Sequence, residues 1–229
     1  MQDLVKLNKE TYNMIAKLFA ETRKYLWDDL KPLGKYTKDG FKILDLGCGS
    51  GRLYHLFEEF QGVEYVGVDQ SEGQIEIAKE KFPELDFQVA EMTELPFEEN
   101  EFDIIYCVAT FHHLPDEKSR IKALDEMKRI LKPGGHIIMT NWNLYSKGTQ
   151  KLVEKGKFKE FEKGDFFVPW LDKDGKVLGE RYYHGFSLEE LEGLFKKTDL
   201  QLEDQYYSTK ARVGTEDDSG NIISVVTSP

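Results

Sequence analysis

The sequence predicts an α/β fold, with a mostly parallel sheet, helices on both faces and a final antiparallel strand. Short apolar segments in residues 43–140 alternate with stretches of helical spacing, a pattern typical of right-handed βαβ crossovers. A turn with three glycines follows the first apolar segment. Near the end of the chain, 13 polar residues without an apolar helical face separate two apolar segments, so we expect these strands to pair antiparallel.

Composition favours one globular domain. The chain has 229 residues, 40% of them hydrophobic, which is enough for a sizeable core and one insertion. It has no apolar run near about 18 residues and no charged-then-apolar leader, so we expect no membrane span, no signal peptide and a cytoplasmic location. Cys48 and Cys107 are its only cysteines, too few for a zinc site or a disulfide framework, and we expect no metal.

The charge is unevenly distributed. A net charge of -11 argues against indiscriminate binding to nucleic acid. Residues 58–103 hold 15 acidic residues and two lysines, so the acidity belongs mainly to this segment. The rest of the chain is close to neutral, and a neutral-to-basic face is compatible with it.

The first part of the chain is predicted as a helical prefix followed by strands. Residues 1–40 form the prefix, because apolar positions recur near helical spacing up to Leu30, and Pro32 and Gly34 then close the stretch. The next three strands are expected over residues 43–46, 63–68 and 86–90.

Two helices are expected between these strands. The amphipathic stretch 53–60 predicts the first. Ser71 and Gln74 match a capping box, which predicts that the second helix begins there and runs to about Phe82.

The strand expected over 102–108 is the most apolar and therefore the central one. A helix after Asp116 and a strand over 136–140 follow it. Ser187 opens another capping box, and the last strands are expected over 200–207 and 221–227.

Residues 142–182 break the alternating pattern. They are aromatic and mixed in charge, with a hairpin turn at 172–175, and we interpret them as an insertion that shapes a substrate pocket. The expected divisions of this single domain are the helical prefix 1–40, a cofactor-binding core 41–141, the insertion 142–182, and a C-terminal helix and hairpin 183–229.

The glycine turn predicts a binding site for a polar small molecule. A dinucleotide fingerprint would place its last glycine at position 52, where the chain has Arg52. Asp45, two residues before the first glycine, would repel a pyrophosphate but suits the ammonium of an amino-acid moiety. S-adenosylmethionine carries such an ammonium, and Asp69 is well placed to bind its ribose hydroxyls. A purely structural tight turn is the alternative.

Several side chains have a structural and a functional interpretation. Arg23 is either a solvated helix charge or a partner for a ligand carboxylate. Glu91 and Met92 are either ordinary loop residues or contacts of an adenine ring. His112 and His113, beyond the carboxyl end of a strand, are candidates for a general base, a hydrogen-bond donor or a stabilising side chain. Six lysines within 147–163 form either a solvated face or a phosphate-contacting surface.

Four motifs resemble those of the class I S-adenosylmethionine-dependent methyltransferases. They are Asp45–Gly51, Asp69, Glu91–Phe97 and Leu131–Gly135. The resemblance implies a Rossmann-like, seven-stranded, mostly parallel sheet with a final antiparallel strand. It also implies S-adenosylmethionine as cofactor and S-adenosylhomocysteine as product. The cofactor-binding residues that we expect are Arg23, Asp45, Gly47, Cys48, Gly49, Asp69, Gln70, Glu91, Met92 and Cys107.

A narrower resemblance covers nearly the whole chain. The segments Tyr12–Ala16, Phe111–His113, Phe167–Trp170 and Arg181–His184, with Trp142, are similar to the tRNA wobble-uridine methyltransferases, which esterify 5-carboxymethyluridine. This resemblance implies tRNA modification, with tRNA as a partner. It raises a small zinc-containing activator as a further partner, for which we recognise no surface.

The expected chemistry is in-line attack on an activated methyl group. A carboxylate acceptor is ionised at neutral pH, so its orientation matters more than a general base. Arg181 is the candidate for holding one carboxylate oxygen, and the expected catalytic residues are His113, Arg181, Tyr183 and His184. The expected substrate-binding residues are Tyr12, His112, Trp142, Trp170 and Tyr182. The alternatives are methylation of a small carboxylic acid or phenol, and cofactor binding without catalysis.

Overall fold

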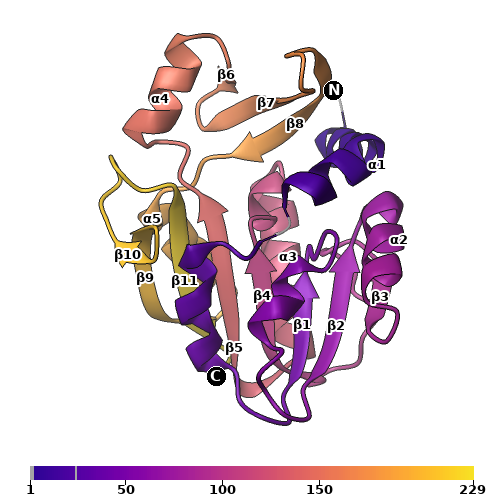
Figure 1. Ribbon diagram of the computed structural model, residues 1–229. Helices are drawn as coiled ribbons and strands as arrows, with labels where there is room; N and C mark the ends of the chain where they lie inside the picture. Colours follow the sequence, from indigo (N-terminus) through magenta and orange to yellow (C-terminus); the bar gives the residue numbers. More distant parts are fainter. Residues whose placement is uncertain (1–2, 24) are drawn as a thin grey trace.

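A computed structural model describes residues 3–23 and 25–229 and contains one large sheet (Figure 1). Its strands lie in the order β10-β9-β11-β5-β4-β1-β2-β3. Their bounds are β1 Lys42–Leu46, β2 Glu64–Asp69, β3 Asp86–Val89, β4 Phe102–Val108, β5 Leu131–Trp142, β9 Gln201–Thr209, β10 Arg212–Val213 and β11 Asn221–Thr227. The predicted seven strands are confirmed, and the two-residue β10 is added at the edge.

The strand directions also follow the prediction. Strands β1 to β5 are parallel to one another, whereas β11 is antiparallel to both β5 and β9. The carboxyl ends of the parallel strands therefore meet at one edge of the sheet, which is where ligands bind in open α/β sheets.

Helices cover both faces of the sheet. On one face, α3 (Glu117–Ile130) and α5 (Leu188–Lys197) contribute to an apolar cluster with the strands. On the other face, α2 (Glu72–Lys81) and the 3-10 helices η1 (Asp28–Tyr36) and η2 (Arg52–Leu56) do the same. The capping predictions hold for the helix starts, because the Ser71 and Ser187 side chains accept hydrogen bonds from the backbone N–H groups of Gln74 and Glu190.

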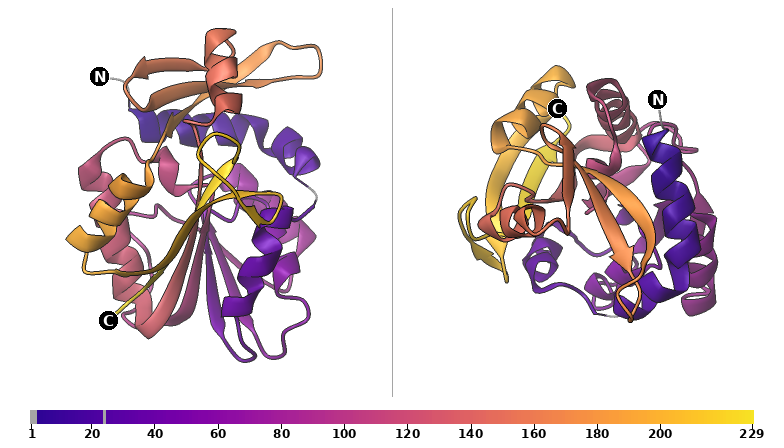
Figure 2. Two further views of the ribbon diagram at one scale, coloured as in Figure 1. Left: turned by 90° about the vertical axis from the view of Figure 1, so that its left-hand side faces the viewer. Right: turned by 90° about the horizontal axis from the view of Figure 1, so that it is seen from above.

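A separate layer lies over the carboxyl ends of the main sheet (Figure 2). It contains helix α1 (Leu4–Thr22), helix α4 (Lys147–Glu154) and a small antiparallel sheet of β6 (Lys159–Glu162), β7 (Asp165–Leu171) and β8 (Val177–His184). The Asn8 side chain joins α1 to β8, since it accepts from the Tyr182 N–H at 2.7 Å and donates to the Tyr182 carbonyl at 3.0 Å. The expected turn between β7 and β8 is present, with hydrogen bonds between the backbones of Asp172 and Lys176 and of Gly175 and Asp172.

Two predicted helices differ from the structure. The stretch 53–60 is not an α-helix: η2 is a short 3-10 helix, and Tyr54, Phe57 and Phe60 each bond through N–H to the carbonyl three residues earlier. Aromatic rings spaced three residues apart align on one face at three residues per turn, which favours this geometry. The prefix is interrupted after Thr22, and Pro32 lies inside η1 instead of ending the prefix.

No helix in residues 3–23 and 25–229 is long and apolar enough to cross a membrane.

Candidate functional site

A cavity of about 200 Å³ lies between α1 and the carboxyl ends of β1, β2 and β4. Residues that the sequence assigned to a cofactor or a substrate gather around it from all parts of the chain. Those in its lining are Tyr12, Arg23, Gly47, Cys48, Gly49, Asp69, Gln70, Glu91, Met92, His113, Trp142, Arg181 and Tyr183. Asp45, Cys107, His112, Trp170, Tyr182 and His184 lie outside the lining.

The glycine turn forms the floor of the cavity. The N–H groups of Gly47 and Cys48 both donate to the Val68 carbonyl, at 2.7 and 2.9 Å, and this fixes the turn against the end of β2. Gly47 has φ +81, and a Cβ there would come within 2.4 to 2.5 Å of the Thr110 side chain. This position therefore requires glycine both for its backbone conformation and for its packing.

Asp69 lies in the cavity lining at the end of β2. One carboxylate oxygen accepts from the Gly49 N–H and the other from the Ser71 N–H, both at 2.9 Å. Burial raises the pKa of Asp69, while these backbone donors oppose the shift. The carboxylate keeps further lone pairs for ligand hydroxyls.

Asp45 lies beneath the turn and not against the cavity. Its side chain is 1% exposed and accepts from the Tyr65 hydroxyl at 2.6 Å. Burial raises the pKa of Asp45 to about 7. The carboxylate faces Tyr65 within the core, so Asp45 adjoins the glycine turn without lining the cavity.

Basic side chains occupy another part of the cavity lining. Arg23, Arg52 and Arg181 all line it. Burial, followed by the nearby charge of Arg181, lowers the pKa of Arg23. Arg181 is 4% exposed, and its Nε has no hydrogen-bond partner among the described residues. Neither Arg23 nor Arg181 forms an ion pair with an acidic side chain of the described chain, so both charges are available to an anionic ligand.

A chain of hydrogen bonds connects Arg181 with His113. Arg181 Nη1 donates to the Tyr183 hydroxyl at 2.9 Å, and the Tyr183 and Tyr12 hydroxyls are 3.2 Å apart. The Tyr12 hydroxyl is 3.0 Å from His113 Nε2, while His113 Nδ1 is 2.8 Å from the Tyr182 carbonyl. Since a carbonyl only accepts, Nδ1 carries the proton and Nε2 accepts from Tyr12. Burial lowers the pKa of His113 to about 3, so the ring is neutral at neutral pH.

Aromatic side chains adjoin this series of hydrogen bonds. Trp142 is stacked on Tyr183, with ring centroids 4.8 Å apart. Behind it, His112 Nδ1 accepts from the Trp142 backbone N–H at 3.2 Å. Trp170 contacts Phe19 and lies under the Arg181 guanidinium, 5.1 Å from its ring centroid. His112 and Trp170 therefore support residues that line the cavity.

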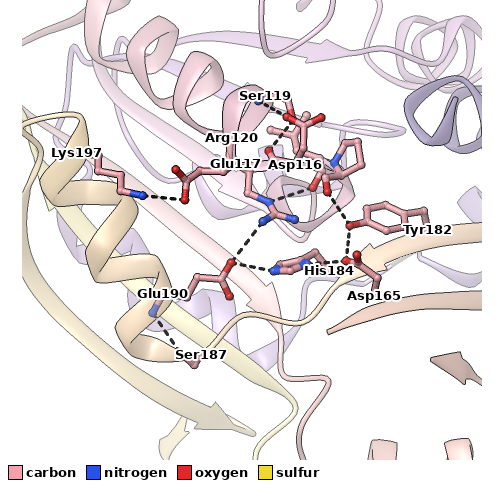
Figure 3. Close-up of polar contacts among 12 residues, drawn as sticks. Asp116, Glu117, Ser119, Arg120, Asp165, Tyr182, His184, Ser187, Glu190 and Lys197 are labelled. Carbon is pink, nitrogen blue, oxygen red and sulfur yellow. Dashed lines mark hydrogen bonds and ion pairs between the residues drawn. The ribbon is translucent and has the colours of Figure 1, made fainter. Parts of the chain in front are cut away.

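His184 belongs to a polar network that fastens the upper layer to the core (Figure 3). Its Nδ1 is 2.7 Å from Asp165 and its Nε2 is 2.9 Å from Glu190. The Tyr182 hydroxyl donates to Asp165 at 2.6 Å, and Arg120 reaches Glu190 at 3.4 Å. Both ring nitrogens therefore face carboxylate oxygens, one from β7 and one from α5. Cys107 is fully buried in the apolar core.

Sequence reasoning missed Gln74 as a site residue. The capping box assigns its side chain to the helix start, yet the side chain lines the cavity, and both amide atoms lack a partner within the described chain. Arg52 also lines the cavity. In the sequence it was noted only because it stands where a dinucleotide fingerprint has its last glycine. Thr110, which packs against Gly47, was not singled out either. Arg52 directly follows the last glycine of the turn, which was a signal in the sequence, whereas Gln74 approaches the turn only in the folded chain.

Known proteins share the domain and the fold. Residues 44–139 match a family model described as a methyltransferase domain. A solved SAM-dependent methyltransferase from Methanosarcina mazei has a TM-score of 0.69 and 21% identity, covering 86% of this chain and 96% of that chain. The putative methyltransferase of Encephalitozoon cuniculi is 29% identical, over 91% of this chain and 90% of that protein. The chain therefore carries a methyltransferase domain over residues 44–139 and shares the fold of a solved S-adenosylmethionine-dependent methyltransferase.

Within this class, the chain is similar to proteins named for tRNA. It is 33% identical to the tRNA (carboxymethyluridine(34)-5-O)-methyltransferase of Arabidopsis thaliana, over 62% of this chain and 34% of that protein. The chain spans about a third of the length of the plant and mammalian relatives that it matches.

Proposed function

We propose that the protein transfers the methyl group of S-adenosylmethionine to the carboxylate of a 5-carboxymethyluridine at the tRNA wobble position. The observation that carries this proposal is Arg181, a buried cation in the cavity lining that has no acidic partner within the described chain. A buried charge is stable only when it is paired, and a carboxylate acceptor supplies the missing partner.

The residues of the cavity fit the cofactor. A Cβ at Gly47 would collide with Thr110, so the turn leaves bare backbone at the floor. In the proposed arrangement Asp69 accepts from the ribose hydroxyls, Glu91 and Met92 adjoin the adenine ring, and Arg23 pairs with the methionine carboxylate. The unsatisfied amide of Gln74 offers one further donor and acceptor.

The cofactor supplies a methyl group on a positively charged sulfur, which is already activated for attack. The chain then has to hold the acceptor carboxylate in line and exclude water. Arg181 holds one carboxylate oxygen through its guanidinium, while Tyr183 and Tyr12 fix the guanidinium through the series of hydrogen bonds that ends at His113. The neutral His113 accepts the hydrogen bond from the Tyr12 hydroxyl and removes no proton from the methyl acceptor.

The tRNA substrate is supported by the relatives named for carboxymethyluridine, in Arabidopsis thaliana and in Saccharomyces cerevisiae. A small carboxylic acid would satisfy Arg181 equally well and remains the alternative acceptor. The two acceptors differ in size, so they are separated by a direct comparison of substrates.

The decisive assay incubates the protein with deuterium-labelled S-adenosylmethionine and an anticodon stem-loop that contains 5-carboxymethyluridine. Nucleoside mass spectrometry should show a labelled methyl ester, and mild alkali should release the label as methanol. A stem-loop with unmodified uridine should gain no label. Label on small carboxylic acids alone, or alkali-stable label on the RNA, would contradict the proposal.

Arg181→Ala should lower turnover on the stem-loop by about 10- to 100-fold, because a hydrogen bond to a charged group contributes about 1.5 to 3 kcal/mol. Its affinity for S-adenosylhomocysteine should stay within about twofold of the wild type. Arg181→Lys keeps the charge but loses the planar donors, and we expect it to restore only part of the rate. Equal losses of turnover and cofactor affinity in Arg181→Ala would assign the residue to the fold.

A further inference from the structure

Another hollow lies beside the cavity. Its volume is about 550 Å³, and it shares Trp27, Arg52 and Trp142 with the cavity lining. Its remaining walls come from the end of α1, from residues 25–29, from Lys210 in the turn after β9, and from Gly220 and Asn221 at the start of β11. We call this hollow the rim pocket. Because Trp142 also stacks on Tyr183, the rim pocket adjoins the residues assigned to the acceptor.

Aromatic surface is concentrated in the rim pocket. Tyr25 is 85% exposed, and it is the one aromatic side chain of the described residues that points mainly to solvent. Trp27 lies next to it in the lining, with the Arg52 guanidinium 4.4 Å above the centroid of its ring. Exposed rings and a stacked guanidinium are the surfaces on which proteins hold unpaired nucleobases.

The rim pocket contains two basic side chains, Arg52 and Lys210, although the chain as a whole is acidic. Its two acids already have partners: Asp28 forms an ion pair with Lys31 at 2.7 Å, and Asp29 accepts hydrogen bonds from Ser208, Ala211 and Asn221. Lys210 is exposed and has no hydrogen-bond or ion-pair partner among residues 3–23 and 25–229. The lysine is therefore available for an anionic group at the edge of the pocket.

The backbone holds Lys210 in place at a conformational cost. Lys210 and Ala211 have φ of +50° and +63°, and they form the two-residue turn between the paired ends of β9 and β10. Such turns normally use glycine or asparagine, because side chains with a Cβ disfavour positive φ. Asp29 fixes this turn by accepting from the Ala211 N–H at 2.6 Å. Backbone strain of this kind collects at functional sites.

We propose that the rim pocket binds the unpaired nucleobase next to the acceptor nucleotide of a single-stranded RNA loop. Tyr25 stacks on that base, and Lys210 contacts the adjoining phosphate. This inference rests on the proposed function, since it assumes that the acceptor is part of an RNA chain. It adds a contact that a free nucleoside or a small carboxylic acid would not make.

The first test measures binding of the anticodon stem-loop by fluorescence anisotropy, with Tyr25→Ala and Tyr25→Phe compared at one salt concentration. Loss of one stacked base should weaken binding about 5- to 100-fold in Tyr25→Ala, and Tyr25→Phe should bind like the wild type. An abasic nucleotide on one or the other side of the acceptor should weaken the wild type and remove the difference between the wild type and Tyr25→Ala. An unchanged difference with both abasic RNAs would overturn the stacking contact.

The second test concerns the phosphate. Lys210→Ala should reduce the salt slope of log affinity by about 0.7, the value for one phosphate contact with a single strand. Lys38→Ala is the matched control, because Lys38 is exposed and lies before the amino end of β1, at the opposite edge of the sheet. Equal slopes for Lys210→Ala and the wild type would refute the phosphate contact.

The same reagents separate this inference from the proposed function. If the protein methylates the stem-loop and Tyr25→Ala leaves the KM for the stem-loop unchanged, the proposed function stands and base binding in the rim pocket is refuted. If binding of the stem-loop depends on Tyr25 but no methyl group is transferred, base binding in the rim pocket stands and the proposed acceptor is refuted. With the free nucleoside as substrate, Tyr25→Ala should equal the wild type in both binding and methyl transfer, because no neighbouring base is present.

Discussion

Replacing Gly47 with alanine tests the packing of the glycine turn against the site. Gly47 has φ +81, and a new Cβ would lie 2.4 to 2.5 Å from three side-chain atoms of Thr110, including its Cβ. A rotamer change of Thr110 moves only two of these atoms, so the backbone has to shift. The left-handed conformation costs about 1 to 2 kcal/mol and the overpacking about 1 to 3 kcal/mol. Together they amount to about 2 to 5 kcal/mol.

Gly175→Ala is the matched control. Gly175 has the same φ of +81, in the turn between β7 and β8, but a Cβ there would meet no atom within 4 Å. The control therefore carries the conformational cost alone. At about 2 to 4 °C per kcal/mol for a chain of this size, Gly47→Ala should lower the melting temperature by about 5 to 20 °C and the control by about 2 to 8 °C.

Thermal unfolding followed by circular dichroism measures both variants, and calorimetry with S-adenosylhomocysteine measures their cofactor affinity. Gly47→Ala should lose affinity, because the same shift moves the turn that lines the cavity. Gly175→Ala should keep it. Equal melting temperatures and equal affinities for the two variants would refute the packing argument.

Three further predictions concern buried polar groups. Asp69→Ala should weaken S-adenosylhomocysteine binding by about 10- to 100-fold in calorimetry, because the Gly49 and Ser71 N–H groups also lose their acceptor; unchanged affinity would count against the ribose assignment. Burial raises the pKa of Asp45 from 3.8 to about 7, so its contribution to stability is full below about pH 4 and is lost as the pH rises to about 7. Asp45→Asn should therefore gain stability over the wild type, on the order of 2 to 4 kcal/mol, across that window in urea titrations, and a pH-independent difference would contradict the shift. Tyr182→Phe should cost about 1 to 2 kcal/mol by losing the bond to Asp165, and additivity with Asp165→Asn in a double-mutant cycle would argue against that bond.

The wild type has to be compared with Asp45→Asn, because the contribution of His113 to stability changes with pH in the opposite direction to that of Asp45. Burial lowers its pKa from 6.5 to about 3, so its contribution to stability is present above about pH 6.5 and is lost as the pH falls. The two effects offset each other in the wild type between about pH 4 and 6.5.

Local signals in the sequence predicted most of the fold. The apolar runs predicted the strands of the main sheet, and the polar link before Asn221 predicted the antiparallel pair β9 and β11. Ser71 and Ser187 marked helix starts through hydrogen bonds within four residues of the chain. The prediction of a helix over 53–60 missed its type, because the apolar spacing fits both an α-helix and a 3-10 helix and does not decide between them.

The site was predictable only in part, because its contacts join distant segments. The residue types around the glycine turn indicated the ligand, and Asp69 follows directly from the end of a strand. The burial of Asp45 against Tyr65 depends on how the parallel strands β1 and β2 pair, and the spacing of residues along the sequence does not reveal this pairing. Likewise, the placement of His184 between Asp165 and Glu190 requires the upper layer to dock on α5.

A crystal structure of the protein with S-adenosylhomocysteine tests the central claim most directly. The account predicts ribose hydroxyls within hydrogen-bond distance of the Asp69 carboxylate, and a sulfur atom that faces the Arg181 and Tyr183 side of the cavity. An adenosyl group bound away from Asp69, or a sulfur atom turned away from Arg181, would contradict it.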